Sequence, residues 1–294
     1  MANAIQQLPA RQLEPLLRAY SDAVQRRRWL AVGVGCVFVV CATLAFVGAE
    51  INLATFWTKL GGFPSYFNRI LTLDSGQRVW TDPAEWFWGL KKWLALLGET
   101  ILMAYVATIL GALGAFVSCF LAAEKISRAP WLAMVVRRFL EICRTVPDLV
   151  FALIFVVAFG LGPMPGVLAL AIHTMGALGK MFGEVVDNID MKPVDGLRSA
   201  GAGFVQTIRF AALPQVLSNF AGYALLRFEI NVRGATVMGF VGAGGIGVEL
   251  LIAVRKFYYS DVSAILALVI CAVFFIDILT SKLRERLVDM ERPS

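Results

Sequence analysis

The sequence predicts an all-α integral membrane protein with about six transmembrane helices. Hydrophobic residues make up 59% of the 294 residues and charged residues only 16%, whereas soluble proteins average about 45–50% and about 25%. The mean hydropathy is +0.72. Apolar runs also recur along the chain at lengths close to the roughly 20 residues that a helix needs to cross a bilayer. A soluble core cannot absorb this much apolar surface, so lipid must be the solvent for much of the chain.

The N-terminal part, residues 1–93, is expected to hold a cytoplasmic segment, the first transmembrane helix and an external interfacial segment. The first apolar run, 29–47, directly follows three arginines and has no small-residue cleavage site at its end. It therefore predicts a retained helix rather than a signal peptide. The stretch 49–93 is too charged to span. Its end, 86–93, is rich in Trp and Lys and predicts an interfacial helix.

Five further apolar runs predict the remaining spans of a membrane domain over 94–287: 94–123, 149–162, 167–182, 215–234 and 262–279. The segments between them are a basic loop, a GPMPG turn at 162–166, a polar segment at 183–213 and a glycine-rich stretch at 239–247. Six spans place both termini on one side of the membrane. The excess of Lys and Arg on that side predicts that it is cytoplasmic, with 288–294 as a cytoplasmic tail.

Charge and motif content exclude several classes of function. The net charge of +6 comes from basic residues beside the ends of apolar runs, where they contact lipid headgroups, so nucleic acid is not an expected partner. The five cysteines form no CxxC pair, which argues against a zinc or redox centre. No Walker-type phosphate loop, Ser/His/Asp site or carboxylate cluster is visible. The chain is therefore expected to be no enzyme and to bind neither metal nor cofactor.

The polar segment contains the most informative pattern, DGLRSAGAGFVQTIRFAALP from Asp195 to Pro214. Its acid, glycine and Leu-Pro positions resemble the cytoplasmic EAA loop, E-A-A-x3-G-x9-I-x-L-P, of ATP-binding-cassette (ABC) importer permeases. The spacing is the same, but Asp195 replaces Glu, Gly196 and Leu197 replace the two Ala, and Ala211 replaces Ile. These departures are similar to the phosphonate branch of that superfamily. The alternative is an ordinary solvated loop between two spans.

Physical chemistry agrees with this resemblance. We expect Asp195 near a helix start, where the dipole favours an acid. Gly201 allows a sharp turn between two short helices, and Pro214 suits the opening of the fifth span. The matching residues form a predicted ATPase-coupling loop within about 183–214: Asp195, Gly196, Leu197, Arg198, Ser199, Ala200, Gly201, Ala211, Leu213 and Pro214.

The wider resemblance covers about 94–287 and includes the stretches 156–174 and 227–247. Both are similar to the permeases of phosphonate or phosphite importers, a branch related to the methionine importer permease. The resemblance implies a type I importer fold, a homodimer and two ABC ATPase subunits that hold ATP and Mg²⁺. It also implies a phosphonate-type substrate-binding protein outside the cytoplasm and a location in a bacterial inner membrane.

The glycine-rich stretch contains Gly242, Gly244, Gly245 and Gly247, which satisfy G-x-G-x-x-G. A dinucleotide site is not expected, because the stretch lies between two spans and no acid follows at the required distance of about 20 residues. An irregular or re-entrant segment near the outer face is expected instead. The glycines then serve either a gate or close helix packing, and the sequence leaves both open.

Polar residues inside the predicted spans are candidates for the translocation path, because charge within the membrane usually faces a cavity or a partner. Glu229 and Arg233 are four residues apart and are expected to pair on one helix face. Arg227 and Asn231 lie on another face, so Arg227 is left to act on a phosphorus oxyanion or to join a structural lattice. His173, the single histidine, is either a buried hydrogen-bonded residue or a substrate contact.

These observations favour the transmembrane subunit of an ATP-driven importer of phosphonate, phosphite, hypophosphite or phosphate, working by alternating access. The alternative within the class is an importer of another small solute such as methionine. An intramembrane enzyme would need catalytic groups that the sequence lacks, and a purely structural membrane protein would not need the EAA-like spacing.

Overall fold

The computed structural model describes residues 10–50, 52–123, 125–126 and 129–289. The chain divides into two compact units, 1–65 and 66–294. The first unit contains α2 (Ala10–Gly48) and α3 (Leu53–Leu60), and the boundary falls within α4 (Phe63–Ile70). Within α2, Arg18–Gly48 is long and apolar enough to cross a membrane. None of that helix's most apolar stretch is buried inside the protein, as expected for a helix whose solvent is lipid.

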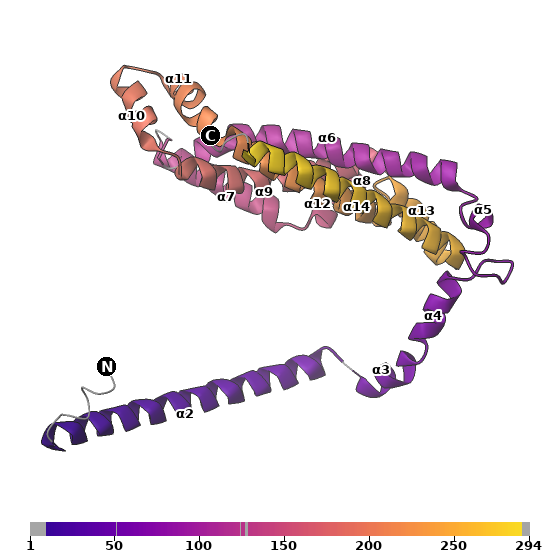
Figure 1. Cartoon of the computed structure of the whole chain (residues 1–294), viewed down its shortest axis with the longest axis horizontal. Coiled ribbons are helices and arrows are strands. Elements are labelled where there is room, and N and C mark those ends of the chain that lie inside the picture. Colours follow the sequence, from indigo (N-terminus) through magenta and orange to yellow (C-terminus); the bar gives the residue numbers. More distant parts are fainter. Residues whose placement is uncertain (1–9, 51, 124, 127–128, 290–294) are drawn as a thin grey trace. The chain divides into compact units, whose positions relative to one another are not determined.

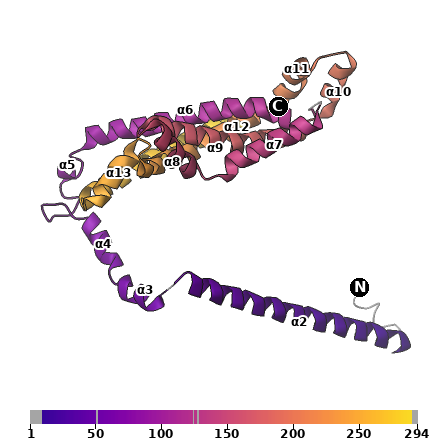
Figure 2. The same cartoon turned by 180° about the vertical axis from the view of Figure 1, so that it is seen from behind.

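The second unit is a helical bundle (Figures 1 and 2). Its helices are α5 (Pro83–Trp86), α6 (Leu90–Ala122), α7 (Pro130–Thr145), α8 (Asp148–Phe159), α9 (Pro163–Asp187), α10 (Met191–Ser199), α11 (Phe204–Thr207), α12 (Leu213–Met238), α13 (Ile246–Arg255) and α14 (Tyr259–Asp289). A π-helix, Ile208–Ala212, leads into α12, and a 3₁₀ turn, Gly239–Val241, follows it.

The predicted number of spans agrees with the structure. Four of the described helices pass as membrane spans on length and apolarity, and two bent helix pairs raise the number to as many as six. The bent pairs are α7 with α8, at 85°, and residues 204–241 with α13, at 48°. The chain is therefore a multi-pass, all-α membrane protein.

The third span differs from the prediction, because the expected basic loop is largely helical. Helix α7 ends at Thr145, and Val146 is extended immediately before Pro147, since proline disfavours helical geometry in the residue preceding it. Helix α7 packs closely against α9. A Cβ on Gly176 would lie 2.6 Å from the backbone nitrogen of Arg144, and one on Gly179 would lie 2.7 Å from the Leu140 side chain.

Two smaller boundaries also differ. Lys91, Lys92 and Trp93 belong to the first turns of α6 rather than to a separate interfacial helix. The turn predicted at 162–166 is displaced toward the N-terminus, because α9 already begins at Pro163. Proline is well tolerated in the first turn of a helix, where its missing N–H has no intrahelical partner.

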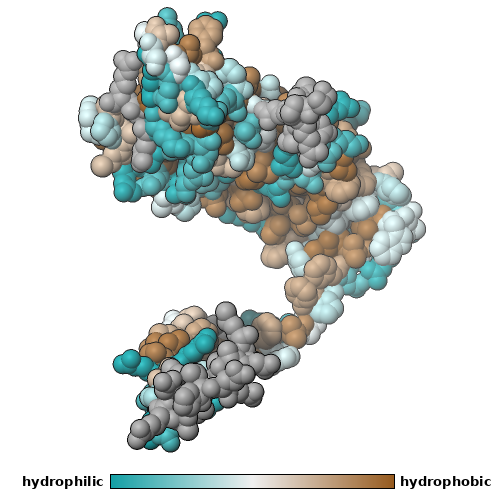
Figure 3. Space-filling model, turned by 60° about the vertical axis from the view of Figure 1, so that its left-hand side comes forward, coloured by the Kyte–Doolittle hydropathy of each residue, from teal (hydrophilic) through white to brown (hydrophobic). Residues whose placement is uncertain are grey.

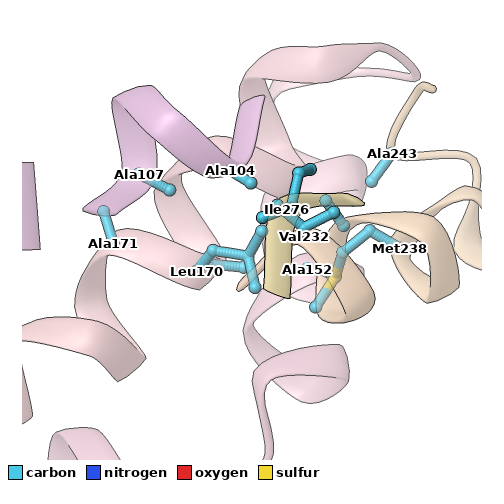
Figure 4. Close-up of a cluster of buried hydrophobic side chains, with 11 residues drawn as sticks. Ala104, Ala107, Ala152, Leu170, Ala171, Val232, Met238, Ala243 and Ile276 are labelled. Carbon is cyan, nitrogen blue, oxygen red and sulfur yellow. The ribbon is translucent and has the colours of Figure 1, made fainter. Parts of the chain in front are cut away.

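The centre of the bundle is built from small residues. Figure 4 shows part of this buried cluster, in which Ala107 of α6 lies beside Ala171 of α9, and which also contains Leu170 of α9, Val232 of α12 and Ile276 of α14. Small side chains let helix backbones approach closely where there is no hydrophobic driving force between helices in lipid. A second cluster is fixed by Phe182 and Phe220, whose rings stack with centroids 3.9 Å apart.

The two ends of the bundle differ in character. At one end, Trp86 donates to Ser263 (2.9 Å), Trp88 donates to Asp261 (2.8 Å), and Lys92 pairs with Glu249 (2.6 Å), which joins α5 and α6 to α13 and α14. Helices α10 and α11 project from the opposite end (Figure 1). Figure 3 is turned toward that opposite end, where hydrophilic residues gather, while hydrophobic residues cover the receding sides.

Candidate functional site

The 190–214 segment contains α10, α11 and the π-helix and forms a helix-turn-helix unit whose second half continues into α12. Helix α10 begins after Asp190, whose carboxylate accepts a hydrogen bond from the backbone N–H of Lys192 (3.0 Å). Asp195 therefore lies in the middle of α10, and the prediction that it sits near a helix start is wrong. The capping acid is Asp190, five residues earlier, and its preference for helix starts could have identified it.

Gly201 makes the turn between the two short helices, with a φ of +84°. Only glycine adopts this left-handed region without steric cost. Pro214 lies in the first turn of α12, as expected. The π-helix joins α11 to α12 without a break, so the 190–214 segment continues directly into a membrane helix.

The 190–214 segment is fastened to the bundle at two places. Gln215 accepts from the backbone N–H of Asp190 (3.0 Å) and donates to the Asp190 carbonyl (3.2 Å). These two bonds join the first residue of the segment to α12. Arg198 donates to the carbonyls of Lys125 and Ile126, both at 3.3 Å, in the connection that follows α6. The segment is thereby tied to the connection that follows α6 as well as to α12.

Two apolar side chains project from this polar unit. Val205 is 73% exposed and Phe210 is 64% exposed. Large exposed apolar side chains on a largely polar segment are typical of a protein interface. Neither residue was predicted from the sequence, because the resemblance rests on the acid, glycine and Leu-Pro positions.

The turn provides a direct test of the local backbone. Replacing Gly201 with alanine should cost about 1–2 kcal/mol, because the added Cβ meets no atom within 4 Å and the penalty is purely conformational. Amide hydrogen exchange in 191–207 should accelerate. Gly196→Ala is the matched control: it lies inside α10, also with no neighbour within 4 Å, and should slow exchange. Equal exchange rates in the two variants would contradict this account.

A second group of residues surrounds a pocket of about 460 Å³ between α8, α9 and α12. Its polar lining consists of Asp148, His173, Arg227, Asn231 and Arg233. We call this the Arg227 pocket. It brings together four of the predicted path residues, while the fifth, Glu229, is 8% exposed and pairs with Arg233. The ion pair expected from the four-residue spacing is therefore present.

Arg227 makes its hydrogen bonds to neutral groups. Its Nε donates to the Thr174 hydroxyl (3.3 Å), and its Nη2 donates to Nδ1 of His173. Thr174 is shared with Asn231, whose amide nitrogen donates to Thr174 (2.9 Å) and to Thr108 of α6 (2.8 Å). Thr108 and Thr174 were not predicted as site residues, since an isolated threonine in an apolar run does not indicate a site.

The glycine-rich stretch lies outside the Arg227 pocket and separates into two kinds of glycine. Gly242, Gly244 and Gly245 have positive φ angles of +78°, +83° and +74° and form the irregular turn before α13. Gly247 faces the end of α12, where an added Cβ would overlap the carbonyl oxygen of Thr236. The stretch therefore makes a tight turn and a close helix contact. No group of three or more potential metal ligands occurs in the described ranges.

Comparison with known proteins identifies the family of this chain. Residues 114–289 match the model of the binding-protein-dependent transport system inner membrane component. The chain is 37% identical over 282 residues to the phosphite transport system permease protein PtxC of Stutzerimonas stutzeri, covering 96% of this chain and 97% of that protein. It is 38% identical over 194 residues to the phosphate-import permease protein PhnE of Mycolicibacterium smegmatis, covering 66% of this chain and 36% of that longer protein.

Solved structures confirm the fold. An inward-facing structure of the MetNI methionine ABC transporter superposes with a TM-score of 0.58 at 20% identity, covering 70% of this chain and 98% of that one. At this level of identity the likeness establishes the type I importer permease fold alone. From the matched family model and the nearly full-length relative, the chain belongs to the family of inner membrane components of binding-protein-dependent transport systems.

Proposed function

We propose that the chain is the membrane subunit of an ATP-driven importer that carries phosphite, phosphonate or a related phosphorus oxyanion. The observation that carries this proposal is the 37% identity to a phosphite transport permease over nearly the whole of both chains. The Arg227 pocket supports it, because an arginine held by neutral groups inside a membrane domain is suited to an anionic solute.

As a permease of this family, the chain is not an enzyme and works with an ATPase and a substrate-binding protein. We infer a homodimer with two ATPase subunits and a binding protein specific for the phosphorus oxyanion. Arg233 supports the pairing of two copies: its side chain is 54% exposed on a membrane helix, and charge on such a helix faces a cavity or a protein partner rather than lipid.

We also infer that both termini are cytoplasmic and that the 190–214 segment docks on the ATPase. The exposed Val205 and Phe210 would fill an apolar groove on that partner, which would hold ATP and Mg²⁺. Closure of the ATPase pair would then displace the segment and, through Arg198 and Gln215, shift α6 and α12. This rigid coupling supports alternating access, in which packed helices hinge or slide between two arrangements.

Uptake by the reconstituted complex tests the proposal. The tagged full-length chain would be purified with its bound ATPase, placed in proteoliposomes with the binding protein, and supplied with phosphite, methylphosphonate, phosphate or methionine. We expect ATP-dependent uptake of at least one of the three phosphorus oxyanions, measured by ion chromatography of the vesicle contents. Uptake of methionine alone would overturn the substrate class, and a chain that recovers no ATPase would overturn the assembly.

A further inference from the structure

The Arg227 pocket contains two arginines in different electrostatic situations. Arg233 forms an ion pair with Glu229 on the same helix. Arg227 has no carboxylate within 4.0 Å among the described residues. Taking a charge out of water is costly unless it gains a partner, so Arg227 is the cation of this pocket that remains available to a ligand.

The partners of Arg227 also determine how its neighbour His173 is protonated. An arginine side chain only donates hydrogen bonds, so Nδ1 of His173 must be the acceptor of the bond from Arg227. A neutral imidazole that accepts at Nδ1 carries its proton on Nε2. His173 lines the same pocket, and its ring also hydrogen-bonds to the backbone of Arg144, so the imidazole is fixed between α7 and the guanidinium. In the described structure, Nη1 of Arg227 makes no hydrogen bond, which leaves further donors free.

Buried groups hold this arginine in place. Thr174 is fully buried and Asn231 is 1% exposed. Thr174 is pressed against α6, where a Cβ added to Gly111 would lie 2.6 Å from it. The Arg227 guanidinium is thus oriented through Thr174 by a network that reaches α6, α9 and α12, which reduces the entropy lost when an anion binds.

We propose that Arg227, held in place by His173, forms an oxyanion-binding site inside the membrane domain, where the transported phosphorus oxyanion binds between its release from the binding protein and its entry into the cytoplasm. This assignment rests on the proposed function. The planar guanidinium presents N–H donors that match the geometry of a tetrahedral oxyanion, and the bond to Nδ1 of His173 fixes its orientation. Arg227 contacts the anion, whereas His173, Thr174 and Asn231 act as positioning residues.

Asp148 lowers the affinity of the site for an anion, as transport requires. Its carboxylate lines the pocket and interacts electrostatically with Arg227, yet the two are too far apart to form an ion pair. A negative charge across the pocket lowers anion affinity without occupying the donors. A conducting site must bind well enough to admit its solute and weakly enough to release it.

Two measurements on the purified complex of permease and ATPase test the site. In the first, sodium phosphite is titrated against the thermal unfolding midpoint without binding protein, with sodium chloride at equal ionic strength as the blank. Phosphite should stabilise the unmodified complex and should not stabilise Arg227→Gln. Asp148→Asn, which keeps an oxygen able to accept the Leu149 N–H, should respond at phosphite concentrations about threefold to tenfold lower.

In the second, uptake and ATPase activity are measured together in proteoliposomes with loaded binding protein. Arg227→Gln should lose at least 90% of uptake while retaining stimulated ATPase activity, because the 190–214 segment is unchanged. Arg227→Lys should recover part of the uptake, since lysine keeps the positive charge but lacks the planar set of N–H donors of the guanidinium. Lys180→Gln is the matched control: it removes one positive charge from α9 outside the Arg227 pocket and should transport normally.

The outcomes separate the two proposals. If the unmodified complex imports phosphite but Arg227→Gln imports it equally well, the membrane site is overturned and the proposed function stands. The same conclusion holds if Asp148→Asn does not bind phosphite more tightly. If the unmodified complex imports no phosphorus oxyanion, the proposed function itself fails. Loss of ATPase stimulation together with uptake in Arg227→Gln would show a structural role and would also overturn the site.

Discussion

Gly247→Ala should prevent the permease from accumulating as a folded protein. A Cβ at this position would overlap the carbonyl oxygen of Thr236 in α12 and would lie 3.0 Å from Cα of Gly239. Backbone atoms cannot rotate away as a side chain can, so α12 and α13 would have to separate. Overpacking costs about 1–3 kcal/mol where side chains can adjust, and the cost here should be about 3 kcal/mol or more.

The expected measurement is the monodisperse yield and the thermal unfolding midpoint of the detergent-purified chain. Gly98→Ala is the matched control, because it lies in α6 with no atom within 4 Å of the added Cβ and should raise helix propensity slightly. A normal yield and midpoint for Gly247→Ala would show that the contact between α12 and α13 is dispensable.

This contact illustrates what the sequence could not decide. The pattern from Gly242 to Gly247 left gating and packing equally open, because glycine has no side chain whose burial could indicate its role. In the structure, Gly244 and Gly245 adopt positive φ angles while Gly247 makes a close backbone contact. The gating role stays a prediction, but the packing requirement at Gly247 now has a physical cause.

The fold class was predictable because lipid imposes a length and an apolar composition on each span. The break at Pro147 was harder, since α7 contains Arg137, which donates to the Ala122 carbonyl (2.7 Å) and pairs with Asp187 (2.9 Å). Hydropathy alone predicts that such a charged stretch does not belong to a transmembrane span. The paired glycines of α9, Gly176 and Gly179, show only in three dimensions that α7 packs there.

In the candidate sites, too, local features were predictable from the sequence and features that depend on tertiary packing were not. The expected pair of short helices joined at Gly201 is present, because the spacing of a local motif fixes local structure. The network around Arg227 was not predictable, since it joins α6 and α9 to α12, and Thr108 and Asn231 are 123 residues apart. Local helix spacing identified the partner of Arg233, four residues away, but tertiary packing alone supplies the partners of Arg227.

Phe210→Asp should abolish recovery of the ATPase with the permease and so eliminate transport. Phe210 is 64% exposed on the π-helix, so the substitution leaves the folded chain largely unchanged. Surface changes of this kind usually alter stability by less than about 0.5 kcal/mol. At the interface the effect is large, because a desolvated carboxylate would replace an aromatic anchor, and such anchors contribute about 2 kcal/mol or more to binding.

Val205→Asp should act in the same direction, and combining the two substitutions should leave no detectable ATPase after affinity purification of the tagged permease. The control is Gln77→Asp, which introduces the same charge at an exposed position in the segment before α5. Helix α5 lies at the end of the bundle opposite α10 and α11 (Figure 2). That variant should retain the ATPase and full uptake. If Phe210→Asp co-purifies the ATPase as well as Gln77→Asp does, the docking surface lies elsewhere. The exposed apolar side chains of the 190–214 segment would then need a different partner.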